Sequence, residues 1–105
     1  MIRRAFGKTD LMVSALGLGC NNFGRRLDLE KTRNVIDSAI EAGINFFDTA
    51  DVYGDRGGSE TLLGATLGTR RNDVIIATKF GLPMTMRGAS RAARVAMFCR
   101  LWRRA

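Results

Sequence analysis

The first 28 residues alternate short apolar stretches with turn-forming residues. Apolar stretches within residues 2–6 and 11–16 flank the sequence Gly-Lys-Thr-Asp, and this pattern predicts a β-hairpin. The sequence SALGLGC, residues 14–20, continues as a short strand that ends in the polar loop NNFGRRLD, residues 21–28. We therefore expect a hairpin, then a strand, then a loop.

Two later segments have the spacing of amphipathic helices. In the first, one helical stripe holds the apolar residues Leu29, Val35, Ile36, Ala39 and Ile40. Asp28 is a suitable N-cap for this helix, and Gly43 is a suitable residue to end it. The second helix follows the sequence Gly-Gly-Ser at residues 57–59 and ends at Gly68. Its apolar side consists of Leu62, Leu63 and Leu67.

Two near-continuous apolar runs predict strands that are covered on both faces. They are INFFDTA, residues 44–50, and VIIATKF, residues 74–80. The loop DVYGDRGGSE, residues 51–60, follows the first run, and TRRND, residues 69–73, leads into the second. Strands that alternate with helices imply parallel βαβ units with right-handed crossovers. The pattern therefore predicts an α/β fold in the order hairpin, β, α, β, α, β.

The pattern changes after Gly81. Residues 82–105 contain six arginines, no lysine and no acidic residue, and they show no strand pattern. One continuous amphipathic helix is excluded, because arginines share a helical face with the large apolar residues. A shorter helix over residues 95–105 does separate them, which leaves open a basic amphipathic helix at a membrane surface. We divide the chain into residues 1–81 and a basic Arg/Ala-rich tail, residues 82–105, either disordered or helical.

Net charge and hydropathy narrow the class of protein. The 105 residues carry a formal charge of +7, but residues 1–81 hold 11 basic and ten acidic side chains, so the excess lies in the tail. We therefore expect no nucleic-acid partner for residues 1–81. No apolar run approaches the ~20 residues of a membrane span, so we expect no membrane partner there. The two arginines near the start are not followed by the apolar region of a signal peptide.

Cysteine and histidine usage adds a second set of exclusions. The chain has two cysteines, far apart, and no histidine. Two cysteines are too few for a disulfide framework in a short secreted protein. A zinc site would need closely spaced Cys or His ligands, and the sequence contains none. We therefore expect no metal and two free thiols, as in a cytoplasmic protein.

Three side chains could together transfer a proton: Asp48, Tyr53 and Lys79. In βαβ folds the active site lies at the carboxyl ends of the strands. Asp48 and Lys79 each lie at such an end, and Tyr53 is in the loop after Asp48. A phenol donates a proton efficiently at neutral pH only if a neighbouring ammonium stabilises its phenolate. Such a relay could protonate a carbonyl oxygen as a hydride reaches carbon. On spacing alone, ordinary solvated loop residues remain the alternative.

A family resemblance strengthens the hypothesis that these three residues are functional. The sequence GINFFDTADVYGDRGGSETLLGATL, followed by RNDVIIATKFG, resembles the amino-terminal signature of the aldo-keto reductases. LMVSALGLGCNNFG resembles that family's first strand and loop, so the resemblance covers about residues 2–81. It implies the amino-terminal portion of a (β/α)8 TIM barrel with a leading β-hairpin, truncated after the third core strand. It also implies NADP(H) bound without a Rossmann fold. In agreement, GLGCNN has Asn22 where the dinucleotide fingerprint needs glycine.

The resemblance also implies roles for individual residues. Of the family's Asp, Tyr, Lys and His tetrad, Tyr53 matches the general acid, Lys79 the residue that favours its phenolate, and Asp48 the partner of Lys79. The residues implied near the nicotinamide are Gly19, Cys20, Asn21 and Asp48. We do not expect Cys20 to be a nucleophile, because the chain has no histidine base. The implied activity is NADPH-dependent reduction of small aldehydes or ketones to alcohols. The individual substrate, the preference for NADPH over NADH and the oligomeric state stay open.

Two departures from the family pattern bear on activity. The chain contains no histidine, and its 105 residues compare with about 250 in a complete barrel. We therefore expect this chain to be inactive alone and poorly folded, and we hypothesise that its tail is the product of a frameshift or a truncated gene. The alternative is a non-enzymatic fragment whose basic tail binds an anionic membrane or nucleic acid.

Overall fold

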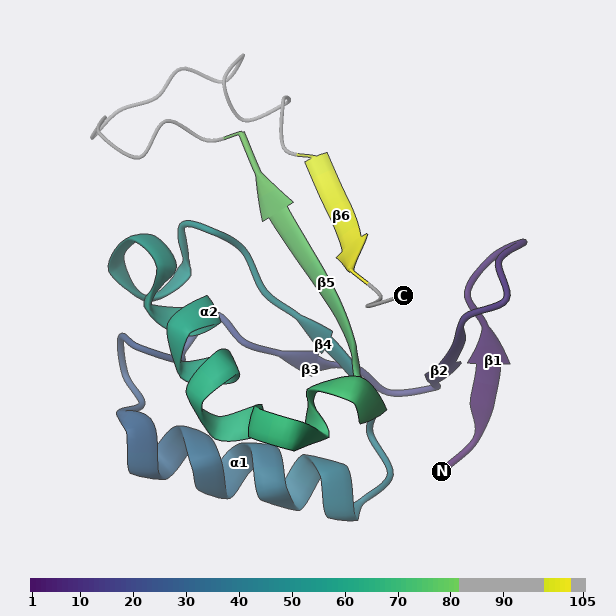
Figure 1. Cartoon of the computed structure of the whole chain (residues 1–105), viewed down its shortest axis with the longest axis horizontal. Coiled ribbons are helices and arrows are strands. Elements are labelled where there is room, and N and C mark those ends of the chain that lie inside the picture. The colour runs from purple at the N-terminus through teal and green to yellow at the C-terminus, as the bar shows by residue number, and fades with distance from the viewer. Residues whose placement is uncertain (82–97, 103–105) are drawn as a thin grey trace.

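A computed structural model of the chain describes residues 1–81 and the backbone of residues 98–102. Strands β1 (Arg3–Ala5) and β2 (Met12–Ser14) form an antiparallel hairpin that lies to one side of a larger sheet (Figure 1). The backbone N–H of Phe6 donates to the carbonyl of Leu11 (2.8 Å) and closes the turn. The predicted hairpin is confirmed.

The larger sheet has four strands in the order β3-β4-β5-β6. Strands β3 (Leu18–Gly19), β4 (Phe46–Asp48) and β5 (Ile75–Phe80) are parallel, as the alternation of strands and helices predicted. Strand β4 is shorter than the strand predicted at residues 44–50. Ladder hydrogen bonds nevertheless continue at both ends, from Ile75 N–H to the Asn45 carbonyl (2.7 Å) and from Thr49 N–H to the Ala77 carbonyl (2.8 Å).

Strand β6 (Phe98–Trp102) contradicts the absence of strand pattern that we inferred for the tail. It pairs antiparallel with β5, in a register from Phe80↔Phe98 to Ile76↔Trp102. The unpaired backbone groups along the edge of β5 provide a template for such pairing, and Phe, Cys, Leu and Trp suit a strand. The alternative of a helix over residues 95–105 is therefore wrong at 98–102. Residues 82–97 and 103–105, on which the remaining expectations for the tail depend, lie outside the described residues.

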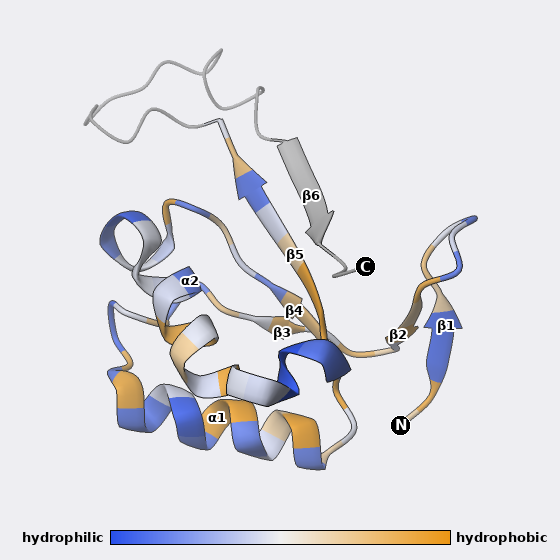
Figure 2. Ribbon diagram, in the orientation of Figure 1, coloured by the Kyte–Doolittle hydropathy of each residue, from blue (hydrophilic) through white to orange (hydrophobic). Residues whose placement is uncertain are grey.

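Helix α1 (Leu29–Glu41) begins and ends where the sequence predicted. The carboxylate of Asp28 accepts a hydrogen bond from the backbone N–H of Lys31 (2.9 Å), which is the expected N-cap interaction. At the other end Gly43 has φ +87°, a left-handed conformation that glycine adopts without strain. Polar and apolar positions alternate along α1 (Figure 2), and its apolar side faces the sheet.

Helix α2 (Tyr53–Leu67) begins earlier than predicted and contains a kink. The sequence predicted a loop over residues 51–60, whereas the structure starts the element at Tyr53 and places Gly54–Gly57 at positive φ. Regular helix resumes after this left-handed turn and ends at Gly68, as expected. The predicted connector to β5 forms the 3-10 helix η1 (Gly68–Asp73).

The core lies between the two helices and one face of the sheet. Its largest fully buried side chains include Phe23, Ile36, Phe47, Leu63 and Leu67. Phe47 points toward the helices, so by the two-residue period of a strand its neighbours on β4 point to the opposite face. There the ring of Phe46 lies 5.7 Å from the ring of Phe6 in the hairpin.

A buried asparagine joins the hairpin to the larger sheet. Asn45 Oδ1 accepts from the backbone N–H of Ser14 (2.6 Å), and Asn45 Nδ2 donates to the carbonyl of Met12 (3.0 Å). The backbone N–H of Asn45 also donates to Ser14 Oγ (3.1 Å). These three bonds fix the hairpin at the amino end of β4, opposite to the end where Asp48 lies.

Candidate active site

Asp48 and Lys79 form an ion pair at the carboxyl ends of neighbouring parallel strands. Asp48 pairs in register with Ala77, so Lys79 lies two residues further along β5 on the same face. The Lys79 ammonium donates to Asp48 Oδ1 (2.5 Å) and to the carbonyl of Thr49 (2.9 Å). The Lys79 side chain is 18% exposed and that of Asp48 is 45% exposed, so the lysine lies in the wall of the site and the carboxylate at its mouth.

Tyr53 completes the predicted group. Lys79 Nζ lies 5.3 Å from the centre of the Tyr53 ring, within the range of a cation–π contact. Backbone hydrogen bonds hold the intervening segment in place, from Asp51 N–H to the Lys79 carbonyl (3.0 Å) and from Tyr53 N–H to the Ala50 carbonyl (3.2 Å). The structure therefore brings all three predicted side chains together, with the Lys79 ammonium close to both the carboxylate and the phenol ring.

Two buried hydroxyl groups, which no sequence motif indicated, connect the elements that carry this site. Thr49 Oγ1 and Ser59 Oγ are 2.9 Å apart, and Ser59 Oγ donates to the carbonyl of Cys20 (2.8 Å). This chain of hydrogen bonds links β4, α2 and the loop after β3. Thr49 directly follows Asp48, and Ser59 starts the regular part of α2, but only the fold brings the two together.

The four residues expected at the cofactor lie at the same rim with different accessibility. Gly19 and Asn21 are exposed, Asp48 is partly exposed, and Cys20 is fully buried. The thiol of Cys20 donates to the Leu18 carbonyl (3.5 Å), and its backbone N–H donates to the Asp48 carbonyl (2.9 Å). A contact between the buried thiol and a cofactor is thus ruled out in this conformation, which leaves backbone atoms of Cys20 for that role.

Burial also changes the acidity of Cys20. Desolvation, assisted by the nearby Asp48 carboxylate, raises the pKa of the thiol from 9.0 to about 12. Thiolate is the nucleophilic form, so this cysteine is protonated and unreactive at neutral pH. The expectation that Cys20 is not a nucleophile is therefore supported by burial as well as by the missing histidine base.

A polar pocket of about 400 Å³ opens beside Tyr53. Its walls come from the loop after β3 and from the start of α2, and they consist of Asn21, Asn22, Arg25, Arg26, Val52, Tyr53, Gly54 and Asp55. A volume of this order suits a small molecule. Within the described residues no group of three His, Cys, Asp or Glu side chains could hold a metal ion.

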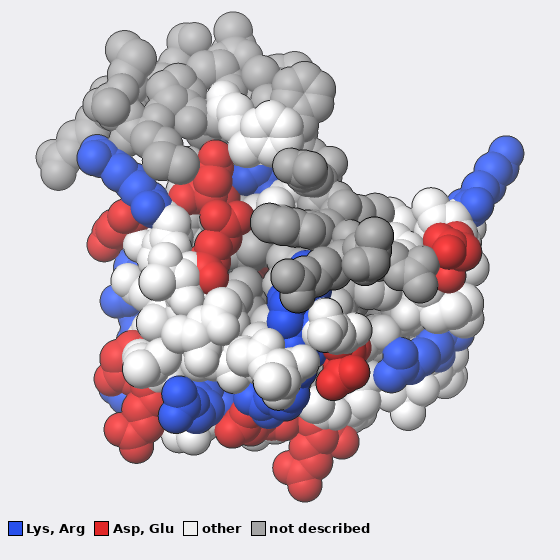
Figure 3. Space-filling model, in the orientation of Figure 1, with Lys and Arg blue, Asp and Glu red and all other residues white. Residues whose placement is uncertain are grey.

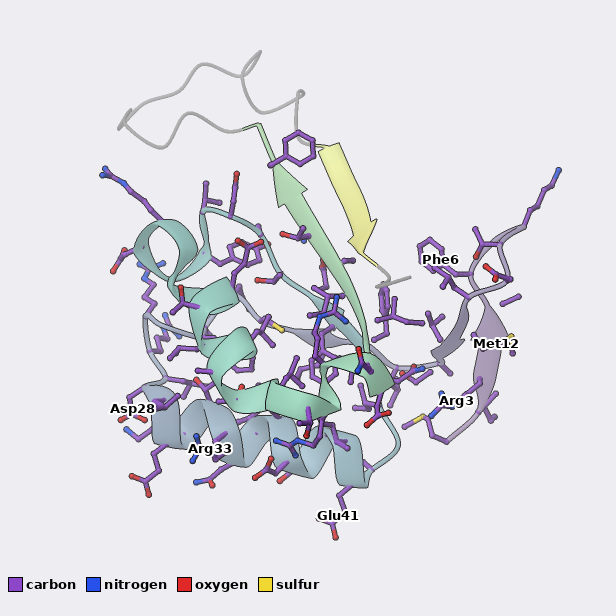
Figure 4. All side chains as sticks on the ribbon, in the orientation of Figure 1. Arg3, Phe6, Met12, Asp28, Arg33 and Glu41 are labelled. Carbon is purple, nitrogen blue, oxygen red and sulfur yellow. The ribbon has the colours of Figure 1, made fainter. Side chains whose placement is uncertain are left out.

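Figure 3 shows charged side chains of both signs interspersed over the described part, at its sides and centre as well as along its lower edge. Several of them lie on α1, where Arg33 and Glu41 point away from the sheet (Figure 4). No helix in residues 1–81 or 98–102 has the length and apolar character needed to cross a membrane.

Comparison with known proteins identifies the relatives of this chain. Residues 15–103 match the model of the aldo/keto reductase family, so the match continues past Gly81. The chain is 46% identical over 81 residues to "Uncharacterized oxidoreductase YqkF" of Bacillus subtilis, covering 77% of this chain and 26% of the relative. It is 41% identical over 85 residues to "Uncharacterized oxidoreductase YrpG" of the same organism, covering 75% and 26%.

A solved structure extends the similarity to the fold. The aldo-keto reductase AKR11C1 from Bacillus halodurans, in its holo form, is 42% identical to this chain with a TM-score of 0.73, covering 84% of this chain and 29% of that one. The chain thus spans about a quarter of the length of the curated relatives it matches. The predicted fold class, the amino-terminal portion of a (β/α)8 barrel with a leading hairpin, is confirmed. The chain belongs to the aldo/keto reductase family.

Proposed function

We propose that Asp48, Tyr53 and Lys79 are the proton-transfer residues of an NADP(H)-dependent reductase that converts small aldehydes or ketones to alcohols. The observation that carries this proposal is the position of the Lys79 ammonium, 2.5 Å from the Asp48 carboxylate and 5.3 Å from the centre of the Tyr53 ring. A positive charge this close to the ring would stabilise negative charge that develops on the phenol during proton transfer.

The rim is open at Gly19, where the nicotinamide end of the cofactor would lie. Gly19 is exposed, and a β-carbon built on it would meet only Asn21 Oδ1, at 4.0 Å. Gly19, Asn21 and Asp48 are the accessible residues that would hold this end of the cofactor. When bound, NADPH supplies the hydride that reduces the carbonyl carbon.

The protein's own residues provide the proton. The Tyr53 hydroxyl donates its proton to the carbonyl oxygen as that oxygen gains negative charge. The Lys79 ammonium would stabilise the negative charge left on the phenolate oxygen, and Asp48 holds that ammonium in position through its hydrogen bond. Solvent then returns a proton to the phenolate, so one proton and one hydride are consumed for each alcohol formed.

We further propose that the 105-residue chain alone has little or no turnover. The sequence contains no histidine, and the Asp48 side chain, at 45% exposed, lies in contact with water. Water screens the charges and weakens the electrostatic stabilisation on which such a site depends. Consumption of NADPH by the purified chain with 4-nitrobenzaldehyde tests this directly. A rate that is clearly above background and is lost in Tyr53→Phe would overturn it.

The roles of the three residues can be tested in a chimaera in which residues 1–81 replace the aligned part of Bacillus subtilis YqkF. We expect NADPH-dependent aldehyde reduction that falls by at least about 100-fold in Tyr53→Phe, the range of general acid catalysis. Phe6→Leu is a control that alters an aromatic ring at the opposite end of β4. An unchanged rate in Tyr53→Phe, with Phe6→Leu also unchanged, would rule out the proposed general acid.

A further inference from the structure

The pocket beside Tyr53 has two positively charged side chains in its wall. Arg25 and Arg26 lie in the loop after β3, and both are exposed. Within the part of the chain that the structure describes, neither guanidinium has an ion pair or a hydrogen bond. Arg70 differs, because its guanidinium binds the Asp37 carboxylate (2.7 Å) and the Thr66 carbonyl (2.9 Å).

The backbone that carries the two arginines is fixed. The carbonyl of Asn22 accepts hydrogen bonds from the backbone N–H groups of Arg25 (3.4 Å), Arg26 (3.0 Å) and Leu27 (3.0 Å). The backbone N–H of Gly24 donates to the Leu27 carbonyl (2.9 Å), which closes the loop. Because the loop backbone is already held by these hydrogen bonds, binding of a ligand by the two arginines would cost mainly the rotamer freedom of their side chains.

The two walls of the pocket are in direct backbone contact. A β-carbon on Gly24 would lie 2.8 Å from the carbonyl carbon of Gly58, and one on Gly54 would lie 2.4 Å from the carbonyl oxygen of Phe23. The loop after β3 and the start of α2 are therefore held at a fixed separation. This contact fixes the backbone of both arginines relative to that of Tyr53.

The charge of the pocket favours an anion. The residues that line the pocket include two arginines and one acidic residue, Asp55, so the lining has a net positive charge. A guanidinium presents parallel N–H donors that match a carboxylate or phosphate. Asn21 and Asn22 add amide donors to the same wall.

We infer that this pocket binds an anionic group, a carboxylate or a phosphate, on a carbonyl substrate whose reactive oxygen lies at Tyr53. The inference rests on the proposed function only for the role of Tyr53. An anionic group could also come from the phosphates of the cofactor. We assign it to the substrate because the pocket includes the phenol that would meet the carbonyl, and the experiment separates the two sources.

The test compares two aldehydes of similar shape, 4-carboxybenzaldehyde and its methyl ester, in a ¹H–¹⁵N NMR titration of the 105-residue chain. We expect the carboxylate to shift the amide signals of residues 21–26 and 52–55 and to bind about tenfold more tightly than the ester, as for a hydrogen bond to a charged group. NADP⁺ in a third titration tests the other source of anionic groups. Equal affinity for acid and ester, or shifts at residues 25 and 26 with NADP⁺ alone, would overturn the inference.

Two matched double substitutions test whether Arg25 and Arg26 cause the preference for the carboxylate. Arg25→Ala/Arg26→Ala is expected to abolish the preference for the carboxylate. Arg3→Ala/Arg4→Ala removes the same charge from two exposed arginines on β1 and should leave the preference intact. If the first pair does not fold, Arg25→Gln/Arg26→Gln and the salt dependence of wild-type binding replace it, because ionic strength weakens an exposed charge interaction. A preference that survives loss of both guanidinium groups, or that salt leaves unchanged, contradicts the inference.

The YqkF chimaera separates this inference from the proposed function. If the chimaera reduces acid and ester with equal kcat/KM, the anion site is wrong and the reductase proposal stands. If the chain prefers the carboxylate in the NMR titration but the chimaera reduces neither aldehyde, the anion site stands and the reductase proposal fails.

Discussion

The carboxylate of Asp48 lies 2.5 Å from the ammonium of Lys79, although 31 positions separate the two residues in sequence. The register of β4 and β5 explains this proximity, because Asp48 pairs with Ala77, two residues before Lys79. Each strand presents one charged side chain on the same face, at the end where the following loops begin. The ion pair is therefore a consequence of two parallel strands that end together.

Asp48→Asn tests what this ion pair contributes. Because Asp48 is 45% exposed, we expect its loss to lower the free energy of unfolding by no more than about 1 kcal/mol. In the YqkF chimaera we expect kcat to fall by at least about tenfold, since the Lys79 ammonium would lose its carboxylate. Urea unfolding and NADPH consumption measure the two effects. Asp37→Asn, which removes the surface pair with Arg70, is the matched control and should leave kcat unchanged.

Asn45→Ala tests the attachment of the hairpin. The substitution removes two side-chain hydrogen bonds and leaves the buried backbone N–H of Ser14 without its partner. We expect a loss of about 1–3 kcal/mol in the free energy of unfolding, measured by urea denaturation. Asn34→Ala on the exposed side of α1 is the comparison, and it should change stability by less than about 0.5 kcal/mol. Similar effects of the two substitutions would show that the hairpin is not held through Asn45.

Gly54→Ala tests the left-handed turn at the start of α2. Gly54 has φ +69°, and an added β-carbon would lie 2.4 Å from the Phe23 carbonyl oxygen and 2.6 Å from the Ser59 nitrogen. We expect a loss of more than about 1 kcal/mol in stability, because the conformation and the space both exclude a side chain. Gly64→Ala should instead increase stability by roughly 0.5–1 kcal/mol, since Gly64 is in regular helix and a β-carbon there meets no atom within 4 Å. The two melting temperatures should therefore shift in opposite directions.

Cys20 gives stability a dependence on pH. Folding raises the pKa of its thiol from 9.0 to about 12, mainly by burial. The unfolded chain therefore loses this proton at lower pH than the folded chain, and stability falls as pH rises through this interval. The contribution is fully present below pH 9.0 and is lost by about pH 12. Urea unfolding of Cys99→Ser over this interval measures it, and further replacement of Cys20 by Ala should remove this part of the pH dependence.

Alkylation of the same thiol provides an independent check. In the Cys99→Ser background, Cys20 is the one remaining thiol of the two in the sequence. We expect iodoacetamide to modify it slowly at pH 8 in the folded chain and quickly in urea, because the side chain is fully buried. Rapid modification without denaturant would contradict the described burial.

Local signals predicted much of this structure. The two ends of α1 were predictable from Asp28 and Gly43, because the N-cap interaction and the left-handed glycine each depend only on residues close in sequence. The meeting of Asp48, Tyr53 and Lys79 was predictable from strand order, since parallel strands bring their carboxyl ends to one rim.

The features that were not predicted from the sequence depend on contacts between residues far apart in the chain. The turn at Gly54 depends on the approach of the Phe23 carbonyl, and the role of Asn45 depends on Ser14, which lies 31 residues away. The pocket at Arg25 and Arg26 exists because the loop after β3 packs on α2. None of these contacts alters the spacing of apolar residues along the chain, so the sequence pattern did not indicate them.

Strand β6 determines where this sheet could grow. Its five residues occupy the backbone donors and acceptors along the outer edge of β5, and they run opposite to the other strands. A barrel strand added beside β5 would have to run parallel to it and use the same backbone groups, so β6 would first have to be displaced. At the other end of the strand order, β3 is an edge strand among the described residues. A complementary polypeptide could therefore join the sheet at β3 without displacing a strand, whereas addition at β5 requires strand exchange.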